Sequence, residues 1–233
     1  MTDKIYGRNA VIEALKSQRE ISKAYIIKEN SKVISKIIDL CKKQNIDIEY
    51  VDKDFFRDTK IKHQGVMVEA KEFSYTDLND VLDKDLLVIL DKIEDPHNLG
   101  AIIRSCEAMG AGAVIIPERR SVKVNSTVYK TSAGAINYMD VVMVTNLKRT
   151  IDKLKEERYW VYGLAGEASD LIYATDLKGK VALVIGNEGN GISRLVRESC
   201  DKLIKIPMIG KINSLNASVA CAISVYEVKR QNG

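Results

Sequence analysis

The sequence predicts an α/β protein in which a small α/β domain is followed by a larger domain with a mostly parallel sheet. Short, continuous apolar runs such as residues 86–90 recur through the last two thirds of the chain. Such runs are typical of strands that are covered on both faces. Helical stretches fall between them, so that strand, loop and helix repeat in order. This order favours a doubly wound parallel sheet.

The first third of the chain contains shorter elements of both kinds. Val11, Ile12 and Leu15 share one helical face, and apolar residues recur at helical spacing over residues 33–41. The predicted elements are a helix over 8–17, a strand over 24–27, a helix over 33–41, and strands over 46–51 and 65–70. A polar stretch follows. We therefore expect a first domain over residues 1–72, a linker over 73–84 and a second domain over 85–233.

The second domain is predicted to alternate strands with helices. The predicted strands cover residues 86–90, 113–116, 141–144, 159–164, 181–185 and 203–206. The predicted helices cover residues 99–109, 126–135, 147–157, 192–200 and 216–230. In open α/β sheets ligands bind beyond the carboxyl ends of the strands. The loops that follow these strands are therefore the places to look for function.

The composition indicates a globular protein and excludes several other classes. The chain has 233 residues, 45% hydrophobic and 29% charged, and its net charge of +4 permits contact with a polyanion without requiring it. Its longest apolar runs, about five residues, are far shorter than the roughly 18 residues that span a bilayer. The first twenty residues lack the apolar core of a secretory signal, so we expect a cytoplasmic protein with no membrane partner.

The cysteines do not form a recognisable pattern. Cys41, Cys106, Cys200 and Cys221 lie far apart, and no C-x-x-C pair occurs. With only two histidines beside them, no spacing typical of zinc ligands can be assembled. We therefore expect free, mostly buried thiols and no metal site.

The first loop of interest covers residues 91–100 and leads into a predicted helix that carries Arg104 one turn inside. Asn98 is placed to cap that helix, since an asparagine side chain can accept hydrogen bonds from free amides of the first turn. A ligand contact by Asn98 is the alternative. Arg104 is equally consistent with a solvated surface charge and with a functional group.

The second and third loops follow the strands at 181–185 and 203–206. Residues 186–191 have the spacing G-x-x-G-x-G, which is not the G-x-G-x-x-G dinucleotide fingerprint, and the chain contains no P-loop motif. This loop is either a tight connection or a place where backbone amides approach a ligand. In the third loop, residues 206–216, Ser214 or Asn216 is placed to cap the last helix, and an irregular loop of this kind also commonly mounts binding groups.

Three ordered motifs occur in these loops: D-P-x-N-x-G-x-x-x-R at 95–104, I-G-N-E-G-x-G at 185–191, and I-P-M-x-G-x-x-x-S-L-N-x-S-V-A at 206–220. Together they resemble the SpoU (TrmH) family of S-adenosylmethionine-dependent RNA ribose 2'-O-methyltransferases in the SPOUT class. The first third resembles the ribosomal-protein-L30e-like substrate-binding domain of many members, with residues 6–11 and 63–66 at its ends. The pair of domains is most similar to the 23S rRNA guanosine-2'-O-methyltransferases.

The resemblance implies a catalytic domain whose C-terminal segment forms a trefoil knot, and a homodimer with its active site near the interface. It implies that S-adenosylmethionine lies on backbone groups of the second and third motifs. Matched residue by residue, the cofactor-binding positions are Gly186, Ile206 and Leu215. The catalytic polar positions are Asn98, Arg104, Glu188, Ser214 and Asn216. The chain departs from many members at Ser105, Cys106 and Ala217, none of which belongs to the polar set.

The chemistry that the resemblance implies is an in-line displacement in which a ribose 2'-hydroxyl attacks the methyl carbon of a sulfonium. Arg104 is the predicted essential residue. A guanidinium has a pKa above about 12, so a bidentate clamp on a neighbouring phosphate is a safer role for it than that of general base. The role of base stays open. His97 is interpreted as a loop residue, and Glu188 is expected to orient the first motif or the RNA.

RNA is the expected partner, and two questions about it stay open at this point. Lys23, Lys28, Lys32 and Lys36 either line an RNA-binding surface or form a solvated face. The target is expected in 23S rRNA, while a tRNA ribose methyltransferase and a ribosomal antibiotic-resistance methyltransferase are alternatives within the same enzyme class. A non-catalytic RNA-binding protein is the alternative from another class.

Overall fold

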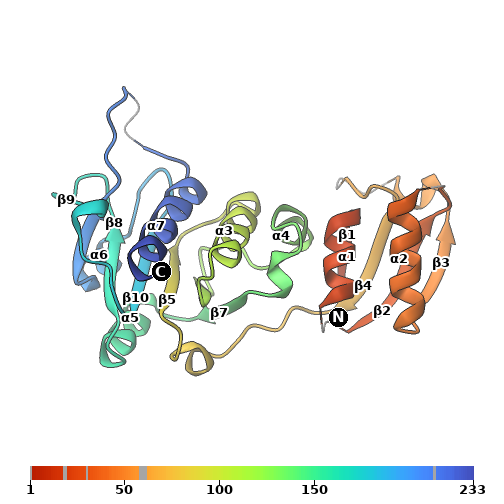
Figure 1. Cartoon of the computed structure of the whole chain (residues 1–233), viewed down its shortest axis with the longest axis horizontal. Helices are drawn as coiled ribbons and strands as arrows, with labels where there is room; N and C mark the ends of the chain where they lie inside the picture. Colours follow the sequence, from red (N-terminus) through yellow and green to blue (C-terminus); the bar gives the residue numbers. More distant parts are fainter. Residues whose placement is uncertain (1, 18–19, 30, 58–61, 212–213) are drawn as a thin grey trace. The chain divides into compact units, whose positions relative to one another are not determined.

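The computed structural model describes residues 2–17, 20–29, 31–57, 62–211 and 214–233. Residues 212–213 of the third predicted loop lie outside the described residues. The chain divides into two compact units (Figure 1), one made of Met1–Ser74 with Val124–Tyr138 and the other of Tyr75–Lys123 with Met139–Gly233. Among the described residues, no helix is long and apolar enough to cross a membrane.

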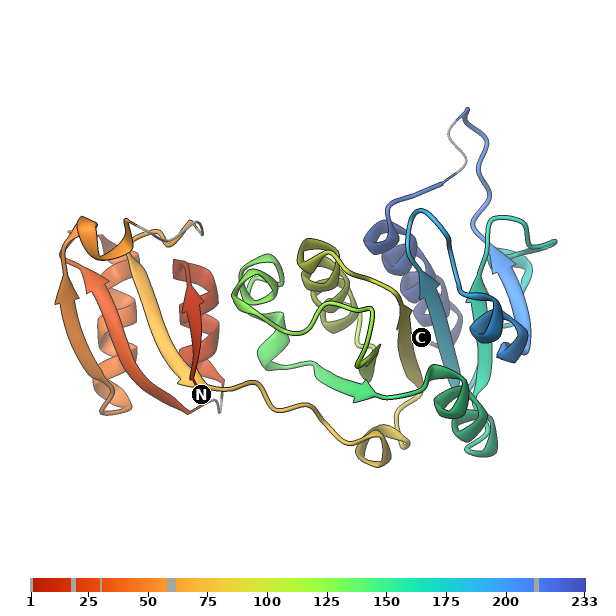
Figure 2. The same ribbon diagram turned by 180° about the vertical axis from the view of Figure 1, so that it is seen from behind.

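The first unit contains a four-stranded sheet in the order β1-β4-β2-β3. Strand β4 pairs antiparallel with β1 and β2, and β2 pairs parallel with β3. Both α1 and α2 cover one face of this sheet, and Figure 2 shows the opposite face. The elements are β1 (Thr2–Tyr6), α1 (Arg8–Lys16), β2 (Ile21–Ile27), α2 (Lys32–Lys43), β3 (Asp47–Val51), the 3-10 helix η1 (Lys53–Phe56) and β4 (Val66–Lys71).

Two short helical segments from later in the chain complete the first unit. They are α4 (Ser126–Thr131) and the 3-10 helix η3 (Ala135–Asn137). The helix predicted over 126–135 is therefore too long. The chain turns because Ala133 and Gly134 adopt positive φ angles of 51° and 92°, which a helix cannot contain. The Tyr138 hydroxyl then donates a hydrogen bond to Glu13 of α1 over 2.9 Å.

The second unit contains a seven-stranded sheet in the order β7-β6-β5-β10-β8-β11-β9, and every pair of adjacent strands is parallel. The predicted mostly parallel α/β class is therefore confirmed. The strands are β5 (Leu86–Asp91), β6 (Ala113–Pro117), β7 (Asp140–Val144), β8 (Trp160–Leu164), β9 (Asp170–Leu171), β10 (Val181–Gly186) and β11 (Lys202–Lys205). The helices are the 3-10 helices η2 (Leu78–Val81) and η4 (Ile172–Ala174), and α3 (Pro96–Ala108), α5 (Leu147–Glu156), α6 (Arg194–Ser199) and α7 (Ala217–Asn232).

The core of the second unit explains the continuous apolar runs in the sequence. All six residues of β5 and the first five of β10 are buried, because helices cover both faces of the central strands. The strand order places β10 between β5 and β8, although β6 to β9 intervene in sequence. The loops that follow β5, β8, β10 and β11 consequently begin at one edge of the sheet, where ligands bind in this class of fold.

Candidate active site

The end of β5 is tied to the loop that follows β10. Asp91, the last residue of β5, is 4% exposed, and its Oδ2 atom accepts a hydrogen bond from the backbone amide of Ser193 over 2.6 Å. A buried carboxylate requires such a partner, because an unpaired charge in the interior is costly. This contact fixes the first and second loops relative to each other. Asp91 was not among the predicted site residues, and only its position at the end of a predicted buried strand could have indicated it.

Helix α3 begins three residues earlier than predicted, so the interpretation of Asn98 as its cap is wrong. The cap is Asp95, whose carboxylate accepts a hydrogen bond from the His97 amide over 2.8 Å, and Pro96 occupies the first turn. That backbone hydrogen bond, followed by one from the His97 side chain, lowers the pKa of Asp95. Asp95 therefore caps α3, and the side chain of Asn98 faces the second loop instead.

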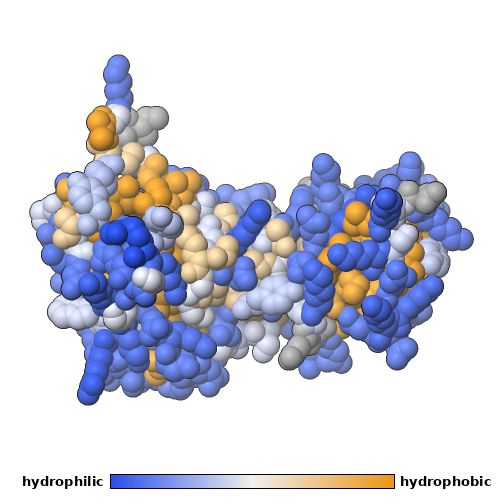
Figure 3. All heavy atoms as spheres, viewed as in Figure 1, coloured by the Kyte–Doolittle hydropathy of each residue, from blue (hydrophilic) through white to orange (hydrophobic). Residues whose placement is uncertain are grey.

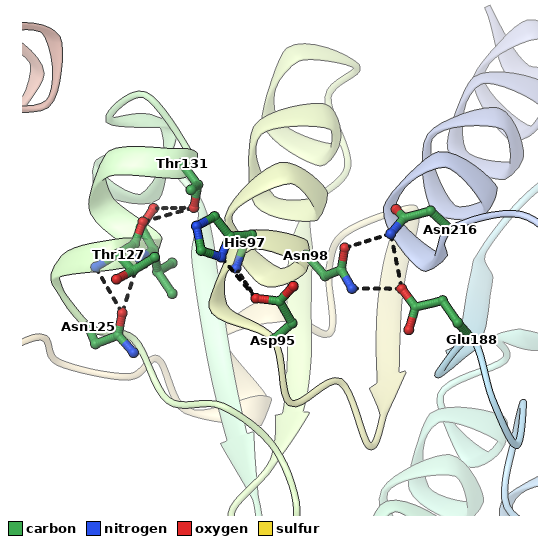
Figure 4. A network of polar contacts seen from close by, with 9 residues as sticks. Asp95, His97, Asn98, Asn125, Thr127, Thr131, Glu188 and Asn216 are labelled. Atoms are coloured by element: carbon green, nitrogen blue, oxygen red, sulfur yellow. Dashed lines mark hydrogen bonds and ion pairs between the residues drawn. The ribbon is translucent and has the colours of Figure 1, made fainter. Parts of the chain in front are cut away.

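A carboxylate and two amides meet where the three loops converge (Figure 4). The Oε1 atom of Glu188 accepts hydrogen bonds from Asn98 Nδ2 over 2.7 Å and from Asn216 Nδ2 over 3.1 Å. Asn216 Nδ2 also donates to Asn98 Oδ1 over 2.9 Å. We call Asn98, Glu188 and Asn216 the amide–carboxylate cluster. It joins one residue from each of the three motifs, which lie up to 118 positions apart in the sequence.

The amide–carboxylate cluster is also built into the start of α7. Asn216 caps this helix, as one of the two alternatives predicted, because its Oδ1 atom accepts from the Ser218 amide over 2.9 Å. The backbone amide of Ala217 donates to Glu188 Oε1 over 3.2 Å. A carboxylate at a helix N-terminus is stabilised by the free amides and by the helix dipole. The negative charge of Glu188 is therefore held by donors from two helices.

A cavity of about 320 Å³ lies beside the amide–carboxylate cluster. All three residues predicted to bind the cofactor, Gly186, Ile206 and Leu215, line it, and so do Glu188 and Ser214. Its wall also contains Leu164 at the end of β8 and residues 165–167 after it, together with Arg197, which forms an ion pair with Glu167. The sequence analysis did not select residues 164–167. Their position after a buried strand, with Gly166 among them, was the available signal.

The Gly186 position cannot carry a side chain. A Cβ atom at Gly186 would lie 2.1 Å from the carbonyl carbon of Gly191 and 2.4 Å from the amide nitrogen of Ile192. The loop closes this tightly because Asn187 and Gly191 pair, with the Gly191 amide donating to the Asn187 carbonyl over 3.0 Å. Backbone groups consequently form this wall of the cavity, and a ligand there would meet amides and carbonyls.

Arg104 is placed differently from the other predicted residues. It lies within α3 and is exposed, and no other described residue provides it with a hydrogen-bond or ion-pair partner. Neither Arg104 nor Asn98 nor Asn216 lines the cavity. The structure therefore brings Asn98, Glu188 and Asn216 together and sets Gly186, Ser214, Ile206 and Leu215 around the cavity, with Arg104 outside both groups.

The described side chains contain no arrangement that points to a metal. Within the described ranges, no group of three or more His, Cys, Asp and Glu side chains is placed to hold an ion. The described cysteines are all free, and three of the four are buried, as the sequence predicts.

A parallel α/β domain with a backbone-lined cavity at the carboxyl edge of its sheet defines a ligand-binding protein of the doubly wound type. The sequence model of the SpoU rRNA methylase family matches residues 85–226, more than half of the chain. The model of the RNA 2'-O ribose methyltransferase substrate-binding domain matches residues 4–76. This protein belongs to the SpoU rRNA methylase family.

Relatives match the chain over nearly its full length. One relative is the Bacillus subtilis protein YacO, which is named a TrmH family tRNA/rRNA methyltransferase. The two sequences are 43% identical, over 98% of this chain and 96% of the length of YacO. A Xanthomonas campestris protein named 23S rRNA (guanosine-2'-O-)-methyltransferase RlmB is 41% identical over 97% and 96%. The SpoU methyltransferase AviRb from Streptomyces viridochromogenes, solved in complex with AdoMet, has the same fold, with a TM-score of 0.87, 23% identity and coverage of 99% and 90%.

Proposed function

We propose that this protein is an S-adenosylmethionine-dependent methyltransferase that methylates a ribose 2'-hydroxyl of RNA, with a guanosine of 23S rRNA as its target. The observation that carries the proposal is that the amide–carboxylate cluster and the backbone-lined cavity are built from the same three loops. The name of the Xanthomonas relative supports the substrate, since it matches both domains at 41% identity.

The cavity fits the proposed cofactor in its chemistry. Its wall at Gly186 presents backbone, while Ile206, Leu215 and Ala220 add apolar surface suited to an adenine ring and a thioether chain. Gly186, Ile206 and Leu215 would hold the cofactor by their backbone groups. When bound, S-adenosylmethionine supplies a methyl group on a positively charged sulfur, which is already a good leaving group.

The residues of the chain then have to position the ribose and remove its proton. In the transfer, the ribose 2'-oxygen would bond to the methyl carbon as the carbon–sulfur bond breaks, S-adenosylhomocysteine would leave, and the hydroxyl proton would pass to solvent water or to Arg104 acting as base. Asn98 and Asn216 orient the hydroxyl, Ser214 in the cavity wall orients the cofactor, and Glu188 holds the two amides in place. Arg104 clamps the phosphate beside the target ribose through its planar fork of donors. A lysine at position 104 would separate these two specific roles, clamp and base, from that of a general positive charge.

The first domain is proposed to bind RNA by shape and phosphate contacts. Its match to the substrate-binding model over residues 4–76 supports this role. So does its excess of lysine and arginine over acidic residues, which is larger than that of the rest of the chain. The domain boundaries stay as proposed: residues 1–72, a linker over 73–84 and residues 85–233. RNA and S-adenosylmethionine are both present in the cytoplasm, where we expect the protein to act.

We further propose that the protein is a homodimer with a knotted C-terminal segment. Val219, Ile223 and Tyr226 of α7 recur at helical spacing and are 45%, 38% and 61% exposed. Apolar surface gathers over α7 in Figure 3, and a second copy of the chain is the proposed cover. The knot is supported by the path of the chain, since α7 follows β11, which lies between β8 and β9, and yet packs against α3 and β10.

The experiment that tests the function compares RNA from cells with and without the gene. Positions of 2'-O-methylation are mapped in total RNA, and one guanosine of 23S rRNA is expected to lose its methyl group when the gene is removed. Loss of a methyl group from tRNA would move the target to the tRNA alternative. An unchanged map would refute the proposed activity.

A further inference from the structure

The first domain contains two pairs in which a lysine lies over a tyrosine ring. The ammonium of Lys23 is 5.4 Å from the ring centroid of Tyr25, and that of Lys28 is 5.4 Å from the ring centroid of Tyr50. Both distances fall in the range of cation–π attraction. Both lysines belong to the set that the sequence marked as either RNA-binding or merely solvated. The two pairs differ in what else surrounds them.

Both members of the Lys23–Tyr25 pair already have partners within the protein. The ring of Phe55 stacks on Tyr25 with centroids 4.9 Å apart and planes 19° apart. The Lys23 ammonium lies 2.8 Å from Glu49 and 3.6 Å from Asp47, and its hydrogen bond to Glu49 raises the pKa of Lys23. This pair therefore has neither a free charge nor a bare ring to offer a ligand.

The Lys28–Tyr50 pair is open. Tyr50 lies on the edge strand β3, is 48% exposed, and contacts no other aromatic ring in the part of the chain that the structure describes. Lys28 likewise has no ion-pair partner among the described side chains. Its neighbour Glu29 is neutralised, because Arg8 Nη2 lies 2.6 Å from its carboxylate. One positive charge and one ring are thus available at the same place.

The open pair borders a cavity of about 390 Å³, which we call the Tyr50 cavity. Ile34 and Ile38 of α2 and Ile27 of β2 give most of the remaining wall an apolar surface, and Glu29, which is paired with Arg8, completes it. A flat apolar slot with an aromatic ring on one side and an ammonium beside it matches a nucleobase attached to a phosphate. An acidic peptide would match the lysine but would leave the exposed ring and the apolar wall without a partner.

We propose that the Tyr50 cavity binds an unpaired nucleobase of the RNA substrate, with the base stacked on Tyr50 and a neighbouring phosphate on Lys28. This inference rests on the proposed function, because it assigns a part of RNA recognition to the first domain. It separates the lysines by role: Lys28 contacts RNA, whereas Lys23 stabilises the sheet. Unpaired bases are the parts of RNA that proteins read most readily, since their faces are accessible.

The test measures binding of a labelled ten-nucleotide single-stranded RNA and of a fully paired RNA duplex to the full chain. Tyr50→Ala is expected to weaken single-strand binding by about 10-fold, the usual effect of losing one stacking contact, and to leave duplex binding unchanged. Tyr50→Phe keeps the ring and should bind as the unmodified protein does. Lys28→Ala should reduce the slope of log affinity against log salt by about 0.7, the value for one phosphate of a single strand.

Phe55→Ala is the matched control, because Phe55 is 45% exposed in the same domain and its ring is already stacked on Tyr25. It should bind the single strand normally. Equal single-strand binding by Tyr50→Ala and the unmodified protein would overturn the proposal, and so would an equal loss in Phe55→Ala or in Tyr50→Phe. Cofactor affinity is measured on the same variants and should not change. Methyl transfer to 23S rRNA by the unmodified protein is measured beside the binding assays, so a failure of the Tyr50 cavity is distinguishable from a failure of the proposed methyl transfer.

Discussion

The amide–carboxylate cluster and Arg104 lie in the same domain, yet they differ in how much of their geometry the protein itself provides. Asn98, Glu188 and Asn216 satisfy one another through hydrogen bonds of 2.7 to 3.1 Å. Arg104 is exposed, with no partner among the residues that the structure describes. Preorganised polar groups lose little freedom when a ligand binds, whereas a free arginine must be ordered by its ligand. The cluster is therefore suited to hold the site, and Arg104 to respond to RNA.

The largest effect is expected at Arg104. Arg104→Ala should lower turnover by about 10²–10³-fold, as loss of one transition-state donor commonly does. Cofactor affinity should stay the same, because Arg104 does not line the cavity. Turnover is measured by methyl transfer to ribosomal RNA, and cofactor affinity by calorimetric titration.

Arg104→Lys sharpens the same comparison. Lysine keeps the charge and loses the planar fork, so a bidentate clamp or an arginine-specific base should fail with lysine as it does with alanine. Near-normal turnover of the lysine variant would remove both specific roles and reduce Arg104 to a general positive charge. A loss of cofactor affinity in Arg104→Ala would contradict the separation of Arg104 from the cavity.

The next largest effect is expected at Gly186. Gly186→Ala should lower the free energy of unfolding by about 1–3 kcal/mol, the usual range for overpacking, and should abolish cofactor binding. The reason is the 2.1 Å approach of a Cβ atom to the Gly191 carbonyl carbon. Thermal unfolding and calorimetric titration measure the two effects.

Gly189→Ala is the control for the Gly186 variant. Its Cβ atom would lie 3.8 Å from Asn187 Oδ1, which is ordinary van der Waals contact. Thermal stability should therefore be unchanged in this variant. A stable Gly186→Ala variant that still binds cofactor would show that the loop can open, against the close packing described above.

A smaller effect is expected at Glu188. Glu188→Ala leaves the two amides and the Ala217 amide without their shared acceptor, and should reduce turnover by about 10-fold or more. Glu188→Gln keeps an oxygen acceptor and should retain more turnover than the alanine variant. The two variants are compared by methyl transfer at saturating RNA and cofactor. Equal turnover in Glu188→Ala and the unmodified protein would mean that the cluster does not hold the site.

The smallest change is expected when the folded protein is treated with thiol reagents, because its thiols should stay almost unlabelled. The Sγ atoms of Cys106 in α3 and Cys221 in α7 lie 3.9 Å apart where the two helices pack. The hydrogen bond between these thiols, together with burial, raises the pKa of Cys221. Burial also raises the pKa of Cys41 to about 11 and of Cys200 to about 12. The thiolate is the reactive form, so labelling at pH 8 should be about 100-fold slower than in the unfolded protein.

Labelling of the thiols also reports on the site, because the packing of α3 on α7 positions Asn98 beside Asn216. The labelled cysteines are identified, and the extent of labelling at each is measured, by mass spectrometry. Rapid labelling of Cys106 or Cys221 in the folded protein would mean that the two helices separate, and that the cluster is not preorganised.

The sequence predicted most of the architecture because buried parallel strands leave continuous apolar runs. It missed β1, whose five residues contain only Ile5 as a buried apolar side chain, and β9, which is two residues long. The spacing predicts Asn98 as a helix cap, but Asp95, three residues earlier, is an equally good capping residue and takes that place. The convergence of Asn98, Glu188 and Asn216 depends on strand order, which periodicity does not contain; only the resemblance grouped these residues.

The measurement that tests the central claim most directly is methyl transfer by the purified protein to unmodified 23S rRNA, with S-adenosylmethionine labelled on its methyl group. The RNA is digested to nucleosides, which are separated and identified by mass spectrometry. The label is expected in 2'-O-methylguanosine, and it should be lost with Arg104→Ala. Label in a methylated base, or no transfer to RNA by a protein that binds the cofactor, would contradict the account.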